Sequence, residues 1–227
     1  MFNAAAAMSF KEKDKELLRW YRKTLEESGA DVHMNAEITD IDVLDADVVV
    51  IATGAHARTL KIPGAERAIT AQDFLEGKAQ VGDSVVIIGG GLTGCEIAYE
   101  LALQGRHPSI VEMTPYLVGA RGICMANSSM LRELLRYHKV PAYLSATVDS
   151  ITDGGVVINA PDGQKTVPAD SVILSVGYAP DTRFAAWKDR KKTAKPVYFV
   201  GDCDHVGSLK TVIRQAYELV QNISYRE

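Results

Sequence analysis

The chain has 227 residues, of which 47% are hydrophobic and 24% are charged, and its formal net charge is -4. These are values of a globular protein, and the length suffices for one large domain or two small ones. The acidic balance argues against a nucleic-acid partner, and we interpret the basic segment 188–195 as a solvated loop. Because no run of 18 apolar residues and no signal-peptide pattern occurs, we expect no membrane contact and a cytoplasmic location.

The first third of the chain predicts a helix followed by short strands. Ser9 and Glu12 match a capping box that opens a helix, and Gly29 closes it. We expect short strands at 30–34 and 37–39, and a short helix within 70–77. The continuous apolar run DVVVIA, which ends just before Thr53-Gly54, is typical of a buried parallel strand.

A compact β-α-β unit follows, with a strand, a helix and a second strand in quick succession. Further along, two Asp-Gly turns separate short strands, which indicates hairpins. We expect residues 178–196 to form an exposed loop. The remaining elements are expected at 84–88, 93–103, 109–113, 127–138, 141–144, 147–151, 156–158, 165–167, 171–175, 197–200 and 209–221.

The segment VVIIGGGLTGCEIA contains a G-x-G-x-x-G motif between a strand and a helix, the context in which this motif indicates a dinucleotide-binding turn. Gly89 permits the sharp turn, Gly91 lets the backbone approach a pyrophosphate, and Gly94 allows close packing of helix on strand. Leu92 and Thr93 lie at the start of the helix expected at 93–103, where free N–H groups favour an anion. The alternative is a structural glycine-rich turn that binds nothing.

Two carboxylates near this motif bear on the choice of nucleotide. Glu112 ends the second strand, about 20 residues after the glycines, where a carboxylate accepts hydrogen bonds from ribose hydroxyls. It would repel a 2′-phosphate, so NAD(H) is favoured over NADP(H), although Arg121 is close enough in sequence to hold a phosphate. Glu96 either faces the nicotinamide end of the site or only favours the helix N-terminus through the dipole.

Two other segments resemble the later motifs of the two-dinucleotide flavoproteins. In that superfamily the ATG strand end packs by the flavin nucleotide, which implies Thr53 and Gly54 here. The aspartate of the GD motif accepts a hydrogen bond from the FAD ribityl chain, which implies Gly201 and Asp202. Alternatively, Asp202 is a turn or helix-capping residue. The segment SVGYAP, with Gly177, resembles the strand end that closes the inserted NAD domain.

The stretches FNAAAA…LLRWYRKTLEESG, VVIIGGGLTGCEIAYELALQG and GDCDHVGSLKTVIRQAYE resemble the C-terminal half of the 2,4-dienoyl-CoA reductase and 2-enoate reductase group, NADH:flavin oxidoreductases related to old yellow enzyme. The resemblance implies an α/β, Rossmann-like two-dinucleotide-binding fold. An NAD(P)-binding domain at 81–177 would be inserted in a partial FAD-binding domain at 1–80 and 178–227. The helix from Leu209 would place its positive end by the flavin ring.

Members of that group also carry an N-terminal barrel with FMN and an iron–sulfur cluster, and a first FAD fingerprint. This chain has neither, so we expect a fragment that works with that missing FMN and iron–sulfur region. The flavin half would lack its first strand, which predicts a homodimer that covers an exposed sheet edge. No two cysteines have C-x-x-C spacing, which argues against the disulfide-reductase relatives.

Two functions fit these features. The first is an oxidoreductase module that passes hydride from NAD(H) to FAD within a larger reductase. The second is a catalytically inactive fragment that holds NAD(H) or an adenine nucleotide only, which the absence of the first FAD fingerprint favours for the chain by itself. The residues indicate no catalytic side chain and no metal ligand.

Overall fold

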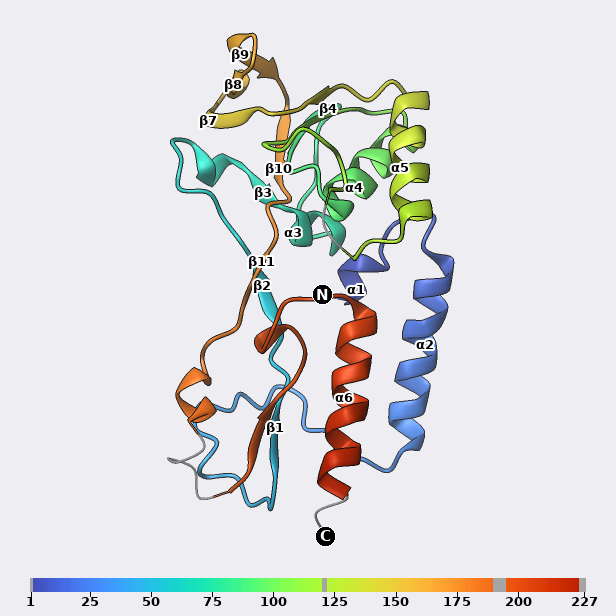
Figure 1. Cartoon of the computed structure of the whole chain (residues 1–227), viewed down its shortest axis with the longest axis vertical. Helices are drawn as coiled ribbons and strands as arrows, with labels where there is room; N and C mark the ends of the chain where they lie inside the picture. Colours follow the sequence, from blue (N-terminus) through green and yellow to red (C-terminus); the bar gives the residue numbers. More distant parts are fainter. Residues whose placement is uncertain (1, 120–121, 190–194, 225–227) are drawn as a thin grey trace. The chain divides into compact units, whose positions relative to one another are not determined.

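The computed structural model describes residues 2–119, 122–189 and 195–224, and the chain divides into two compact units. Unit 1 comprises Met1–Phe2, Leu17–His56 and Tyr178–Glu227, and unit 2 comprises Asn3–Glu16 and Ala57–Gly177. The ribbon in Figure 1 shows the elements of both units. Among the described residues, no helix is long and apolar enough to span a membrane.

Unit 2 is built on a five-stranded sheet in which each neighbouring pair of strands is parallel. Its order, β3-β10-β4-β5-β6, places β4 at the centre. The apolar run of β4 explains this position, because a central parallel strand is buried on both faces. The strands are β3 (Ile69–Thr70), β4 (Ser84–Ile88), β5 (His107–Val111), β6 (Ala142–Tyr143) and β10 (Ser171–Leu174).

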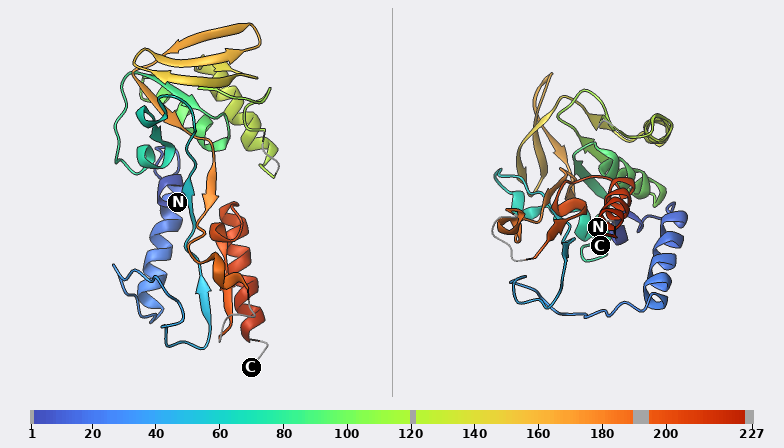
Figure 2. Two further views of the ribbon diagram at one scale, coloured as in Figure 1. Left: turned by 90° about the vertical axis from the view of Figure 1, so that its left-hand side faces the viewer. Right: turned by 60° about the horizontal axis from the view of Figure 1, so that its bottom comes forward.

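Helices and an antiparallel sheet contribute to separate cores on either side of the parallel sheet. Val85 and Ile87 pack in one core with residues of the helices, whereas Val86 and Ile88 pack in another with residues of a three-stranded sheet. This alternation follows from the two-residue period of a strand. The covering elements, which Figure 2 shows from two further sides, are α3 (Ala71–Leu75), α4 (Leu92–Leu103), α5 (Met125–Tyr137), β7 (Thr147–Thr152), β8 (Gly155–Ala160) and β9 (Gly163–Pro168).

The N-terminal segment forms two helices, α1 (Phe2–Ala5) and α2 (Glu12–Glu27). The left-handed Gly29 follows α2, with φ +74°, as the sequence predicts. The predicted capping box is wrong, because the Ser9 hydroxyl donates a hydrogen bond to Glu100 of α4 instead, at 2.7 Å. A tertiary partner has replaced the local one.

Unit 1 has a much smaller sheet, in which β1 (Val49–Ile51) and β12 (Val197–Phe199) pair in parallel. Among the described residues of unit 1, one apolar core contains Ile41, Val49, Ile51, Phe184, Val197 and Cys203. Helix α6 (Leu209–Ser224) follows β12. The strands predicted at 30–34 and 37–39 are not formed. These residues are exposed and pair with no strand in the described structure, and a strand without a partner has no ladder to hold it.

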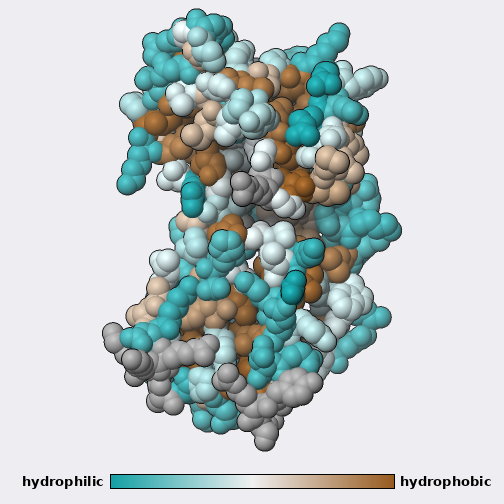
Figure 3. All heavy atoms as spheres, in the orientation of Figure 1, coloured by the Kyte–Doolittle hydropathy of each residue, from teal (hydrophilic) through white to brown (hydrophobic). Residues whose placement is uncertain are grey.

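Large apolar side chains reach the surface of unit 1 in unusual number. Helix α2 buries none of its residues, and Val50 in the centre of β1 is 47% exposed. Exposed apolar patches are visible on the surface in Figure 3. The exposed set from these elements and α6 is Trp20, Tyr21, Leu25, Val50, Ile213, Tyr217 and Val220. In other proteins, exposed apolar patches often mark interaction surfaces or ligand-binding grooves.

The division between the units differs from the predicted domain boundaries. Residues 57–80, expected with the flavin half, belong to unit 2, because β3 joins its parallel sheet and α3 packs into its core. The region predicted as an exposed loop contains β11 (Tyr178–Pro180), which pairs with β2 (Ala55–Ala57), and a short helix, η2 (Ala185–Lys188). Residues 190–194 of that predicted loop lie outside the described residues.

Candidate nucleotide-binding site

The glycine-rich turn links β4 to α4, and the backbone around it leaves no room for side chains at two positions. Gly89 has φ +108°, and its N–H donates to the carbonyl of Val111 at 2.8 Å. A Cβ atom at Gly89 would overlap the carbonyl oxygen of Ser175, and one at Gly94 would overlap the carbonyl oxygen of Gly89. The glycines predicted from the motif are therefore required here by sterics alone.

Gly91 differs from these two glycines because it borders open space. It is the N-cap residue of α4, and no side chain caps the helix there. A Cβ atom at Gly91 would have no neighbour within 4 Å. Leu92 and Thr93, half-buried, open the first turn of α4. An uncapped helix N-terminus that borders open space is a site for an anion, since its N–H groups lack intrahelical partners.

Glu112 lies directly beside this turn, as the motif predicts. It follows the last residue of β5, and its Oε2 accepts the N–H of Gly90 at 2.6 Å. Its Oε1 accepts the N–H of Thr114 at 2.8 Å. Each carboxylate oxygen has a further lone pair, so the group can still accept hydrogen bonds from a ligand. Arg121, the alternative phosphate partner, lies outside the described residues.

The principal contact of Glu96 in the described structure is an ion pair, and its two predicted roles, toward the nicotinamide or the helix dipole, stay predictions. Its carboxylate pairs with the ammonium group of Lys11 at 2.5 Å, and the side chains of Lys11 and Glu96 are 22% and 14% exposed. Sequence reasoning missed Lys11 because the contact joins residues 85 positions apart, and no local pattern connects them.

The cysteine in the first turn of α4 is a core residue. Cys95 is fully buried, and its thiol donates to the carbonyl of Gly90 at 3.3 Å. Burial raises the pKa of the Cys95 thiol to about 12, and the charges of Glu112 and Glu96 act in the same direction. The thiol is therefore protonated at neutral pH and unreactive.

In unit 1, the end of β1 forms a turn held by a second acidic residue. Gly54 is left-handed, with φ +78°, and its carbonyl accepts the N–H of Asp181 at 3.0 Å. The Arg183 guanidinium, 2.8 Å from the Asp181 carboxylate, lowers the pKa of that group, and the hydroxyl of Thr53 contributes in the same sense. The sequence motif marks Thr53 and Gly54 but gives no signal for Asp181.

The Gly-Asp motif after β12 shapes the loop before α6. Gly201 is left-handed, with φ +72°, and its N–H donates to the side chain of Gln215 on α6 at 2.9 Å. Asp202 Oδ1 accepts a hydrogen bond from the N–H of Gly207 at 3.0 Å, and this bond stabilises the turn before α6. Helix α6 begins at Leu209, as predicted.

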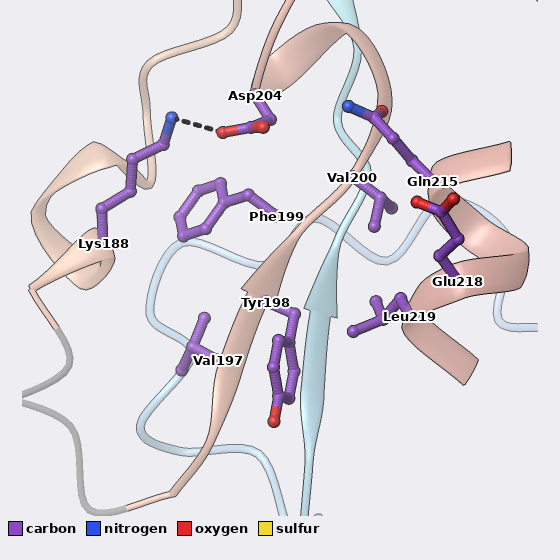
Figure 4. A pocket seen from close by; sticks show the side chains of 9 residues that line it. All are labelled: Lys188, Val197, Tyr198, Phe199, Val200, Asp204, Gln215, Glu218 and Leu219. Carbon is purple, nitrogen blue, oxygen red and sulfur yellow. Dashed lines mark hydrogen bonds and ion pairs between the residues drawn. The ribbon is translucent and has the colours of Figure 1, made fainter. Parts of the chain in front are cut away.

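An open groove of about 400 Å³ lies between β12 and α6, and Figure 4 shows the side chains that line it. The Lys188 ammonium and the Asp204 carboxylate pair at 3.1 Å on one side, and Gln215 and Glu218 of α6 lie on the other. Along the groove, β12 has β1 as its one strand partner in the described structure.

The predicted residues thus fall into two groups. Unit 2 brings together the turn and its acidic partner: Gly89, Gly91, Leu92, Thr93, Gly94, Glu96 and Glu112. Unit 1 holds the residues predicted for the flavin: Thr53, Gly54, Gly201, Asp202 and Leu209. Gly177, with φ +91°, is the last residue of unit 2, and its carbonyl accepts the N–H of Arg58 at 3.0 Å.

A parallel sheet with a glycine-rich turn, an uncapped helix and a carboxylate at the next strand end defines a nucleotide-binding oxidoreductase fold. The chain belongs to the pyridine nucleotide-disulphide oxidoreductase family, whose model matches residues 42–222. Proteins of this family bind FAD and NAD(P)H. The α/β fold with parallel sheets is the one that the sequence predicts.

The more specific resemblance is to enoate-type reductases. The chain is 34% identical to a cinnamate reductase of Clostridium sporogenes over 94% of its length, and 28% identical to a bilirubin reductase of Mediterraneibacter gnavus over 95%. The solved structure of a 2-naphthoyl-CoA reductase in complex with 2-naphthoyl-CoA matches 95% of the chain, with a TM-score of 0.85 at 28% identity. The chain spans about a third of these proteins: 32%, 34% and 33% of their lengths. It is homologous to their C-terminal part.

Two glycines of the turn can be tested against one another. We expect Gly91→Ala to leave the unfolding transition nearly unchanged but to weaken NADH binding, because the added methyl group enters open space that the pyrophosphate would use. We expect Gly89→Ala to lower the stability of unit 2 by about 1–3 kcal/mol, through overpacking and a positive φ. Thermal unfolding and NADH titration of both variants check this. Equal effects of both substitutions on stability would contradict the assignment of Gly91.

Proposed function

We propose that this chain is the module of a larger NADH:flavin reductase, of enoate or dienoyl type, that passes hydride from NAD(H) to FAD. The observation that carries the proposal is the uncapped N-terminus of α4 at Gly91, which borders open space and lies beside the carboxylate of Glu112. The family and its enoate-type relatives supply the context.

The residues of unit 2 fit NAD(H). Gly91 and the first-turn amides at Leu92 and Thr93 would hold the pyrophosphate, because they offer N–H donors and a positive dipole end without a competing cap. Glu112 would hold the adenosine ribose, and its charge disfavours a 2′-phosphate. Two backbone N–H groups fix the position of the carboxylate, so it is preorganised for this contact.

Gly91, Leu92, Thr93 and Glu112 would hold NADH, which would supply the hydride, and bound flavin would be its acceptor. No side chain needs to move a proton in that transfer, and we assign none as catalytic. The residues of this chain would bind and orient the nucleotides. The buried thiol of Cys95, protonated at neutral pH, takes no part.

The residues of unit 1 fit FAD only in part. Thr53, Gly54, Gly201 and Asp202 offer two left-handed turns and an acceptor, and the start of α6 at Leu209 offers a positive dipole end. The sequence has one G-x-G-x-x-G motif, and it lies in unit 2. The pyrophosphate of FAD would therefore need a second cradle that the described residues of unit 1 do not provide.

That absence favours a second candidate, a nucleotide-binding fragment that holds NAD(H) or an adenine nucleotide and catalyses nothing by itself. Its support is that unit 1 has a small core and a two-stranded sheet of β1 and β12, whereas unit 2 has a five-stranded parallel sheet. The two candidates differ in one property, which is whether the protein retains flavin.

The visible absorption spectrum of the purified protein separates the candidates. For the reductase module we expect yellow flavin bands that bleach when NADH is added without oxygen, in the presence of added FAD if necessary. A colourless protein that binds NADH but takes up no FAD would establish the binding fragment instead. A protein that binds neither would overturn both.

The role of Glu112 can be tested through nucleotide selectivity. We expect Glu112→Gln to weaken NADH binding about tenfold or more, because a hydrogen bond to a charged group is worth roughly 1.5–3 kcal/mol. NADPH should lose less, so the preference for NADH should shrink. Fluorescence titration with both nucleotides measures this, with the exposed Glu133→Gln on α5 as a control. An unchanged ratio of the two affinities would remove Glu112 from the site.

We also propose that a second copy of the chain covers the apolar surface of unit 1. Exposed apolar side chains on α2, β1 and α6 favour association. We expect light scattering to show a dimer at micromolar concentration, and Ile213→Asp on α6 to shift it toward the monomer. A monodisperse monomer of the unsubstituted protein would contradict the proposal.

A further inference from the structure

Helix α4 carries two carboxylates on one face, one helical turn apart, although its N-terminus is the proposed anion site. Glu96 lies four residues after Leu92, the first residue of the helix, which is roughly 6 Å along the axis. Glu100 follows at the spacing that places side chains next to one another. A negative charge at Glu96 opposes the binding of a pyrophosphate at the N-terminus unless a positive charge compensates it.

The segment Met8–Lys11 covers both carboxylates. Met8 is buried in the core of unit 2, which fixes the segment on the helix. The backbone N–H and the hydroxyl of Ser9 donate to Oε2 of Glu100, at 3.0 and 2.7 Å. The centres of the Phe10 and Tyr99 rings are 5.2 Å apart, and Tyr99 lies between Glu96 and Glu100 in the sequence.

The two carboxylates receive different partners. Glu100, which is 8% exposed, is satisfied by the neutral donors of Ser9 and Gln104 and lies further from the N-terminus. Glu96 receives a full positive charge from Lys11 at 2.5 Å. The Asp14 carboxylate is the other acidic group near this ammonium, at 3.9 Å. The single cation of the segment therefore pairs with Glu96, which of these two carboxylates on α4 is the one closer to the N-terminus of the helix.

We propose that Lys11 is a positioning residue of the dinucleotide site, which neutralises Glu96 and so allows the N-terminus of α4 to accept a pyrophosphate. The inference rests on the proposed function, because it concerns the affinity for NAD(H). Lys11 contacts no ligand in this role. Both groups are mostly shielded from water, so the charges interact more strongly than on an open surface.

The experiment is a set of NADH titrations on the full chain at low and at physiological salt. Lys11→Met leaves Glu96 uncompensated, and we expect NADH affinity to fall about tenfold at low salt, and less as salt screens the charge. Lys11→Arg keeps the charge and should bind like the unsubstituted protein. The double substitution Lys11→Met with Glu96→Gln removes both charges and should restore affinity to within about threefold. Lys13→Met is the matched control, since Lys13 is exposed and pairs with Glu16.

The outcomes separate this inference from a purely structural role of the ion pair. If Lys11 only fastened the segment, the double substitution would bind no better than Lys11→Met, and the loss would not depend on salt. That result, or unchanged binding by Lys11→Met, overturns the inference while the proposed function stands. If the unsubstituted protein binds no NADH, the proposed function fails and the inference fails with it. Should Lys11→Met not fold, the comparison of Glu96→Gln with the unsubstituted protein decides. This substitution removes the negative charge and leaves Lys11 positive, so we expect tighter NADH binding at low salt, and unchanged or weaker binding would overturn the inference.

Discussion

The closure of the backbone around Gly89 is the constraint on which the rest of unit 2 depends. Its N–H is held by the carbonyl of Val111, and the carbonyl of Ser175 lies where a side chain would be. The turn between β4 and α4 is thus clamped between the ends of β5 and β10. Because these strands are parallel neighbours of β4, their carboxyl ends meet at one edge, and the proposed ligand site lies there.

The geometry of the turn at Gly89 also determines where the charged groups of the proposed site lie. The helix must start at once after the turn, so its uncapped amides border the open space at Gly91. The end of β5 brings Glu112 to the same edge, where Gly90 and Thr114 orient its carboxylate. In the proposed site, a positive helix end beside a fixed negative group would discriminate among nucleotides by the charge on the ribose. The same helix carries Glu96 behind the site, where Lys11 meets it.

The two units contrast in how completely they bury their apolar surface. In unit 2 the sheet is covered on both faces, and residues such as Ile87 and Ile158 are fully buried. In unit 1 two strands share one small apolar core, while α2 buries none of its residues. Burial of apolar area is the main source of stability, so unit 1 gains most from a partner that covers it.

The sequence by itself determined the parallel strands, the glycine turn, the start of α6 and the place of Glu112, because these depend on short-range patterns: apolar runs, glycines that sterics demand and regular spacing. Tertiary structure decided what depends on distant partners. Ser9 bonds Glu100 rather than capping its own helix, and Lys11 pairs with Glu96 across 85 positions. The strands predicted at 30–34 and 37–39 do not form, since no neighbouring strand offers them hydrogen bonds. A local sequence pattern limits the conformations that a segment can adopt, and the tertiary partners available to the segment decide which conformation forms.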